Sequence, residues 1–164
     1  MDNKIFFLLY NLIKNNKRLH NVHKVIIRIS TFIIGILYIG IGIKIILDFN
    51  FKRLDYFVIP LCAFIFTTVL RNVINRPRPF DMLDITPFRE HKSGKSFPSR
   101  HTVSGTIMSF AILTVNIPLG IVSLILSLIL AISRIMAGVH YPSDILGAFG
   151  VSAIFACYFW FVRI

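Results

Sequence analysis

The sequence predicts an all-α integral membrane protein with about five transmembrane helices and an N-terminal amphipathic helix at the membrane interface. Hydrophobic residues make up 55% of the 164 residues, and the mean hydropathy is +0.75. An ordinary soluble domain is less apolar than this. Long stretches carry no charge, the longest being 102–132, and charged residues gather between them. The length allows a single domain, 1–164, with residues 1–24 as its interfacial part.

Residues 3–18 predict a short amphipathic helix. Apolar residues recur there at helical spacing, and basic residues follow them: Phe6, Leu9, Tyr10, Ile13, then Lys14, Lys17 and Arg18. Such a segment suits the membrane interface, and it is too short to span a bilayer upright. The alternative is a short, tilted first span.

Five segments downstream have the hydropathy of spans: 25–47, 54–74, 99–115, 118–136 and 142–161. Asn116-Ile117-Pro118 divides the uncharged stretch 102–132, which is too long for one span. In the last segment Ala148, Ser152 and Ala156 repeat at every fourth residue, a spacing that allows close helix packing in lipid. With alternating spans, the end of the second, the start of the third and the junction of the fourth and fifth lie on one side.

The net charge of +11 predicts an anionic partner. Because the basic residues lie mostly in hydrophilic breaks between apolar segments, they favour anionic lipid headgroups and a phosphate ligand, and no nucleic-acid motif is present. Cys62 and Cys157 lie inside apolar stretches and are interpreted as small buried hydrophobic residues. No disulfide or metal site is predicted.

Three polar runs fall on the side that the alternation of spans selects. Arg71 and Arg78 are seven residues apart, so both guanidinium groups can point from the end of the second span into one pocket. Guanidinium binds phosphate oxygens in a bidentate manner. Pro77 and Pro79 are expected to end the helix. As an alternative, the arginines could be interfacial anchors.

The second run, Pro98-Ser99-Arg100-His101, opens the third span. Backbone N–H groups at a helix start bind anions, and the Ser99 hydroxyl adds a donor. His101 could deliver a proton to a leaving oxygen. Arg100 could meet a second phosphate or an anionic lipid.

The third run is Ser133-Arg134, at the end of the fourth span, followed by His140 and Asp144. Asp144 falls in the first turn of the last helix, where a carboxylate suits the helix dipole. It could also hold His140 in one tautomer and stabilise its charged form.

The order and spacing of these runs resemble the type 2 phosphatidic acid phosphatase (PAP2) family over about 71–144, with Arg71 where the family has Lys and Arg100 where it has Gly. The resemblance implies hydrolysis of phosphomonoesters or diphosphates without metal or cofactor. By that likeness His140 attacks phosphorus and forms a phosphohistidine, Asp144 orients His140, and His101 protonates the leaving oxygen. Residues implied to bind the phosphate are Arg71, Arg78, Ser99, Arg100, Ser133 and Arg134.

A site at the end of a membrane bundle implies a membrane lipid phosphate as substrate. The small size is similar to that of bacterial members that hydrolyse undecaprenyl diphosphate in recycling the cell-wall carrier lipid. Phosphatidylglycerophosphate, phosphatidic acid and lipid A 1-phosphate are alternatives within the family. Rival classes are a catalytically silent membrane protein that binds anionic lipid, a transporter and a soluble haloperoxidase.

The expected location is the cell membrane, crossed several times. The resemblance implies that the site faces the extracytoplasmic side. The positive-inside rule points the other way, because basic residues near the N-terminus lie on the side of the site: Lys4, Lys14, Lys17, Arg18 and Lys24. The sequence specifies no oligomeric state.

Overall fold

The structure is a computed structural model that describes residues 2–14, 16–88 and 93–161. The described residues form helices and no strand, which confirms the all-α prediction. In chain order the elements are α1 (Asp2–Lys14), α2 (Lys17–Leu47), a 3₁₀ turn (Phe51–Arg53), α3 (Asp55–Ile74), α4 (Pro79–Met82), α5 (Arg100–Leu113), α6 (Ile117–Met136) and α7 (Pro142–Phe161).

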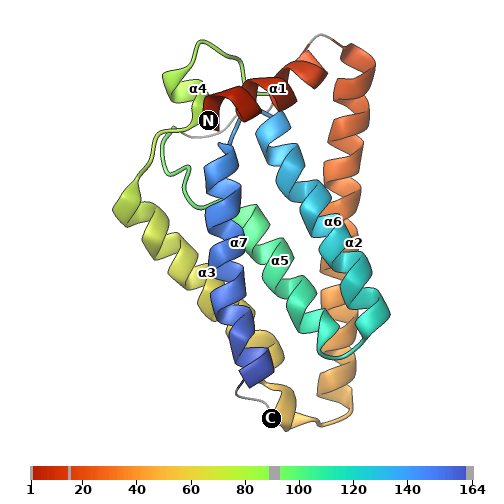
Figure 1. The fold of residues 1–164 in the computed structure, drawn as a ribbon. Helices are drawn as coiled ribbons and strands as arrows, with labels where there is room; N and C mark the ends of the chain where they lie inside the picture. The colour runs from red at the N-terminus through yellow and green to blue at the C-terminus, as the bar shows by residue number, and fades with distance from the viewer. Residues whose placement is uncertain (1, 15, 89–92, 162–164) are drawn as a thin grey trace.

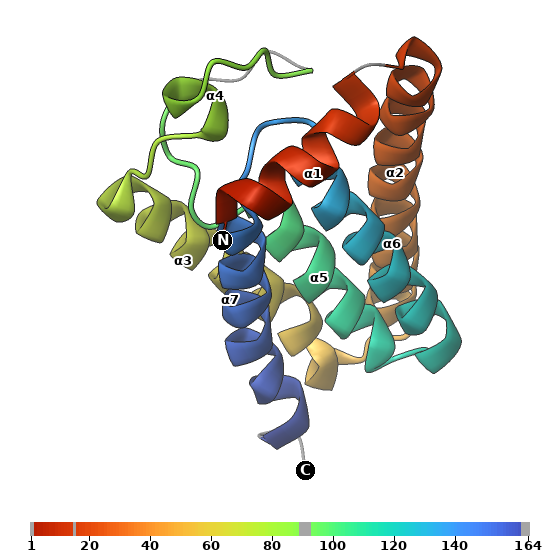
Figure 2. The same ribbon diagram turned by 45° about the horizontal axis from the view of Figure 1, so that its top comes forward.

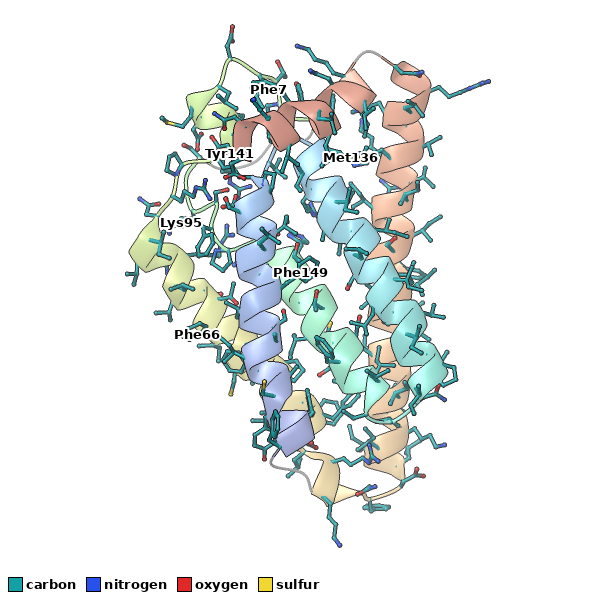
Figure 3. All side chains as sticks on the ribbon, in the orientation of Figure 1. Phe7, Phe66, Lys95, Met136, Tyr141 and Phe149 are labelled. Carbon is teal, nitrogen blue, oxygen red and sulfur yellow. The ribbon has the colours of Figure 1, made fainter. Side chains whose placement is uncertain are left out.

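The long helices form a bundle in which α5 is central, in contact with α2, α3, α6 and α7. Most residues of α5 are buried, including Val103, Ile107 and Ala111. The faces of α2 and α3 that point away from the core carry exposed, large apolar side chains such as Phe32 and Leu61. Figure 3 shows the labelled Phe66 on α3, another exposed side chain of this kind. Such an apolar exterior is the surface of a membrane protein.

Four helical segments have the length and hydropathy to cross a membrane: Arg18–Leu47, Asp55–Met82, Ile117–Met136 and Pro142–Phe159. The expected third span, 99–115, corresponds to α5, which has only 14 residues. At 1.5 Å per residue α5 is roughly 21 Å long, less than the hydrocarbon core of about 30 Å. α5 is therefore a short helix enclosed by the four longer ones.

The breaks between helices follow from local chemistry. Asn16 caps α2, because its side-chain oxygen accepts the backbone N–H groups of Arg18 and Leu19 at 3.0 and 3.2 Å. Asn116 caps α6 in the same way, with the N–H of Leu119 at 3.0 Å. The predicted break at Asn116-Ile117-Pro118 therefore separates α5 from α6.

The N-terminal helix differs from the prediction in its length and its packing. It ends at Lys14, and residues 17–24, expected to be interfacial, form the first turns of α2. Figures 1 and 2 show α1 lying across one end of the bundle. Phe6 and Tyr10 are buried there, and the Tyr10 hydroxyl donates to the carbonyl of Thr86 at 2.9 Å. α1 thus covers the end of the bundle as part of its core.

The two cysteines are also placed differently from the prediction. Cys62 on α3 and Cys157 on α7 are exposed on the outside of the bundle. Of their apolar neighbours in the sequence, Leu61 and Tyr158 are exposed, whereas Ala63 and Ala156 are buried. Apolar character alone therefore did not distinguish a core position from an outward-facing one.

Candidate active site

The three polar runs meet at the end of the bundle that α1 covers. The end of α3, the start of α5 and the junction of α6 and α7 all lie there (Figure 1). Figure 3 shows the labelled Tyr141 of that junction beside α1. The rings of Tyr141 and Phe6 are 5.8 Å apart, so α1 packs directly against the segment that carries His140.

His140 and Asp144 form a buried pair. Their exposed fractions are 3% and 0%, and His140 Nδ1 lies 3.4 Å from Asp144 Oδ2. This distance is at the long limit for a hydrogen bond. His140 lies in the turn before α7 and Asp144 lies in the first turn of α7, as predicted. The spacing of four residues brings the two side chains together.

The Asp144 carboxylate collects further donors. The backbone N–H of Tyr141 donates to Oδ2 at 2.8 Å, and the Ser96 hydroxyl donates to the same oxygen. The guanidinium of Arg76 donates to Oδ1 at 2.8 Å. Because donors hold both carboxylate oxygens, the side chain is fixed in position and favoured as an anion.

Ser96 and Arg76 were not among the predicted site residues. Ser96 is fully buried, and its Oγ also lies 3.4 Å from His140 Nδ1. Arg76 bonds the Ser143 hydroxyl at 2.6 Å and forms an ion pair with Asp2 of α1 at 3.1 Å. Their contacts are made through loops and through α1, whose paths the sequence pattern did not indicate.

Burial lowers the pKa of His140 below its ordinary value of 6.5. Asp144 opposes this shift, whereas the positive charges of Arg78 and Arg71 add to it. The imidazole is therefore neutral at physiological pH. With Nδ1 facing the carboxylate, the proton belongs on Nδ1, and Nε2 keeps the lone pair that a nucleophile needs.

This shift predicts a low-pH limit to activity. If neutral His140 is the nucleophile, kcat/KM falls only as pH drops below 6.5, toward the folded-state pKa. As pH decreases over the same range, the free energy of unfolding also decreases. The reason is that His140 in the unfolded chain has an ordinary pKa and binds the proton more readily than in the folded protein. The measurement is the dependence of kcat/KM on pH for two substrates whose phosphate groups have different pKa values. A decrease at low pH that is the same for both substrates belongs to the enzyme. A shared limb at or above 6.5 would contradict the prediction.

Arg71 and Arg78 are both buried, and they reach the site by different routes. Arg71 lies in the last turn of α3 and donates to the carbonyls of Pro98 at 2.7 Å and Ser96 at 3.3 Å. Asn75, in a left-handed conformation with φ 41°, ends the helix before Arg78. The prediction that the two arginines lie two turns apart on one helix is therefore wrong. The helix ends before Arg78, and it also ends before Pro77 and Pro79, which were expected to stop it.

Arg78 lies in the extended segment that leads into α4. Its Nε donates to the carbonyl of Gly94 at 3.0 Å, and one terminal guanidinium nitrogen donates to the carbonyl of Val139 at 3.4 Å. Asp81 accepts the backbone N–H groups of Arg78 and Gly94, which ties the loop to this segment. A guanidinium has five N–H donors, more than these bonds use, so each arginine can also hold phosphate oxygens.

His101 and Arg134 line a cavity of about 680 Å³ between α2, α5 and α6. His101 is exposed in the first turn of α5, and Arg134 is buried near the end of α6. Neither Arg71, Arg78 nor His140 is among the described residues lining this cavity. The carbonyl of Arg134 accepts the backbone N–H of Val139 at 3.3 Å, which connects this cavity to the segment that carries His140.

The remaining predicted residues differ in their placement. Ser99 is buried at the start of α5, where its backbone N–H donates to the carbonyl of Asp144 at 3.1 Å and joins α5 to α7. The Arg100 guanidinium lies over the ring of Phe64 at 5.6 Å and lines a second cavity, of about 470 Å³. The buried Ser133 hydroxyl donates within its own helix to the carbonyl of Leu130 at 2.6 Å.

Together these groups form a neutral buried imidazole, an anchored carboxylate and a set of guanidinium groups at the end of an apolar helix bundle. Comparison with known proteins gives the same assignment, because the model of the PAP2 superfamily matches residues 53–163. The chain belongs to the PAP2 superfamily. The match includes all three polar runs and every helix from α3 to α7.

Two curated PAP2-type relatives carry the names of phosphatases. The chain is 32% identical over 127 residues to the lipid A 1-phosphatase of Rhizobium etli, covering 66% of this chain and 54% of that protein. It is 37% identical over 84 residues to the undecaprenyl-diphosphatase BcrC of Bacillus subtilis, covering 51% and 44%. The chain thus spans about half the length of these relatives.

The crystal structure of Aquifex aeolicus LpxE has the same fold. Its TM-score with this chain is 0.76 at 18% identity, covering 97% of this chain and 94% of that one. The similarity of fold to this structure therefore includes α1 and α2, which lie outside the residues that the family model matches. With its apolar exterior, the chain is a multi-pass membrane protein.

Proposed function

We propose that this PAP2 protein is a membrane lipid phosphatase that acts through a phosphohistidine, and that its substrate is undecaprenyl diphosphate. The observation that carries the proposal is the buried pair of His140 and Asp144 beside Arg71 and Arg78. A structural role alone does not account for a neutral imidazole, a fully buried carboxylate and two buried cations in one place. Relatives named as phosphatases support the reaction class.

In the first step the lone pair of His140 Nε2 attacks the terminal phosphorus. A P–N bond forms, the phosphoanhydride P–O bond breaks, and undecaprenyl monophosphate is the leaving group. His101 gives a proton to the leaving oxygen. Arg71, Arg78 and Arg134 stabilise the charge on the transferring phosphoryl group, and Ser99 at the start of α5 supports it. Asp144 stabilises the imidazolium character that develops on His140.

In the second step water attacks the phosphohistidine. His101, now neutral, takes a proton from the water as the P–O bond forms and the P–N bond breaks. Inorganic phosphate leaves, and His140 and His101 return to their starting protonation states. The two steps together consume one water for each phosphate released.

The location that fits this activity is the cell membrane, with the site on the extracytoplasmic face, as the PAP2 resemblance implies. A lipid substrate keeps its tail in the bilayer while its phosphate enters the end of the bundle. The net charge of +11 is suited to anionic lipids around the protein. A second candidate substrate is lipid A 1-phosphate, favoured by the name of the relative from Rhizobium etli.

The experiment that tests the proposal is phosphate release by the purified protein in detergent with EDTA present. Undecaprenyl diphosphate, lipid A, phosphatidylglycerophosphate and phosphatidic acid are compared at equal surface concentration. We expect the highest kcat/KM on undecaprenyl diphosphate. A higher kcat/KM on lipid A would make lipid A the substrate. If the folded protein released phosphate from none of the four lipids, the proposed phosphatase activity would be refuted.

A further inference from the structure

The 680 Å³ cavity beside His101 is lined with basic groups from three helices. His23, Lys24 and Arg28 come from α2, His101 from α5 and Arg134 from α6. Among the described residues that line it, none is acidic. His23 is buried, and its Nε2 lies 3.0 Å from the carbonyl of Ser133, which fixes α2 against α6 at this point.

The position of the cavity relates it to the leaving group. In an in-line displacement the leaving oxygen lies opposite the nucleophile. His101, the proposed proton donor to that oxygen, lines the cavity, whereas His140 is not among its described lining residues. The proposed role of His101 therefore assigns this cavity to the part of the substrate that departs from phosphorus.

The positive charge of the cavity indicates the chemical class of the leaving group. Lys24 and Arg28 are four residues apart on α2, so they share one face of the helix. Hydrolysis of a lipid monophosphate releases a neutral alcohol, which gains nothing from cations. Hydrolysis of a lipid diphosphate releases a lipid phosphate, whose anionic oxygens bind guanidinium and ammonium groups well. Ile27, Phe32 and Phe88 line the same cavity and suit the first carbons of the lipid chain.

We propose that Lys24 and Arg28 form a second phosphate subsite that holds the phosphate retained on the lipid and so selects lipid diphosphates over monophosphates. This inference rests on the proposed function and specifies its substrate class. The first phosphate lies between Arg71, Arg78 and His140, and the second lies on the α2 side of His101. Neither Lys24 nor Arg28 belongs to the sequence motifs of the site.

The test uses two substrates with one tail, farnesyl diphosphate and farnesyl monophosphate, in detergent micelles. For the double variant Lys24→Met and Arg28→Met we expect kcat/KM on the diphosphate to fall about 10- to 100-fold, as for the loss of charged hydrogen bonds. Activity on the monophosphate should stay within about threefold. The charge-keeping pair Lys24→Arg and Arg28→Lys should retain most of the diphosphate preference, and it also checks that the α2 surface tolerates change.

Arg18→Met is the matched control, because Arg18 is an exposed cation on α2 outside the cavity. It should leave both activities unchanged. Equal losses on both substrates, or none, in the double variant would overturn the subsite and leave Lys24 and Arg28 as interfacial anchors. Folded wild-type protein that is inactive on both farnesyl substrates and on undecaprenyl diphosphate would instead overturn the proposed function, and the subsite with it.

Discussion

Replacing His140 with glutamine is expected to reduce phosphate release by at least about 10³-fold, because the proposed nucleophile is lost. His101, in the wall of the neighbouring cavity, is not placed to substitute for it. Glutamine is preferred to alanine because His140 is only 3% exposed, and alanine would leave a cavity among buried groups. Release is measured in detergent on the best substrate, and rapid quenching with radiolabelled substrate should show phosphoenzyme in the wild type alone.

The matched control is His20→Gln, a second histidine on α2 that is outside the proposed site. It should retain wild-type kcat. Thermal unfolding of both variants shows whether the bundle is intact. A folded His140→Gln protein that keeps more than about a tenth of the wild-type rate would refute the phosphohistidine.

Replacing Asp144 with asparagine is expected to lower kcat by about 10² to 10⁴-fold while KM changes little. The amide carries one acceptor oxygen and two N–H donors, whereas Asp144 is surrounded by donors from Tyr141, Ser96 and Arg76. An amide nitrogen facing His140 would favour the wrong tautomer. KM should be spared because Arg71 and Arg78, the proposed phosphate-binding residues, donate to backbone carbonyls and not to the Asp144 carboxylate.

The same substitution should destabilise the protein. Asp144 is fully buried, and the change leaves donors facing donors at a cost of about 2–4 kcal/mol. The contribution of Arg76 to that cost is small, because its side chain is 31% exposed and also pairs with Asp2. Asp84→Asn, an exposed carboxylate in the loop after α4, is the control and should change neither property. Unaltered kcat in Asp144→Asn would show that the carboxylate is only a helix-start residue.

The transmembrane organisation could be predicted because lipid excludes charge so strongly. The expected spans 54–74, 118–136 and 142–161 correspond within a residue or two to α3, α6 and α7. The expected span 99–115 also agrees with α5 within two residues at each end, and it runs past Leu113 because the uncharged Thr114 and Val115 carry no signal that the helix has ended. The start of α2 was missed for a related reason: its first turns are basic, yet they continue the helix beyond the apolar span.

The sequence by itself determined the membrane bundle, the order of its helices and the pairing of His140 with Asp144. Hydrophobicity and a spacing of four residues are local properties that can be read along the chain. Only the tertiary structure brought Ser96 and Arg76 to Asp144, linked Asp2 of α1 to Arg76, and placed Lys24 and Arg28 beside His101. These contacts join residues tens of positions apart through loops and helix crossings. Their geometry is set by packing of the whole bundle, which leaves no periodic trace in the sequence.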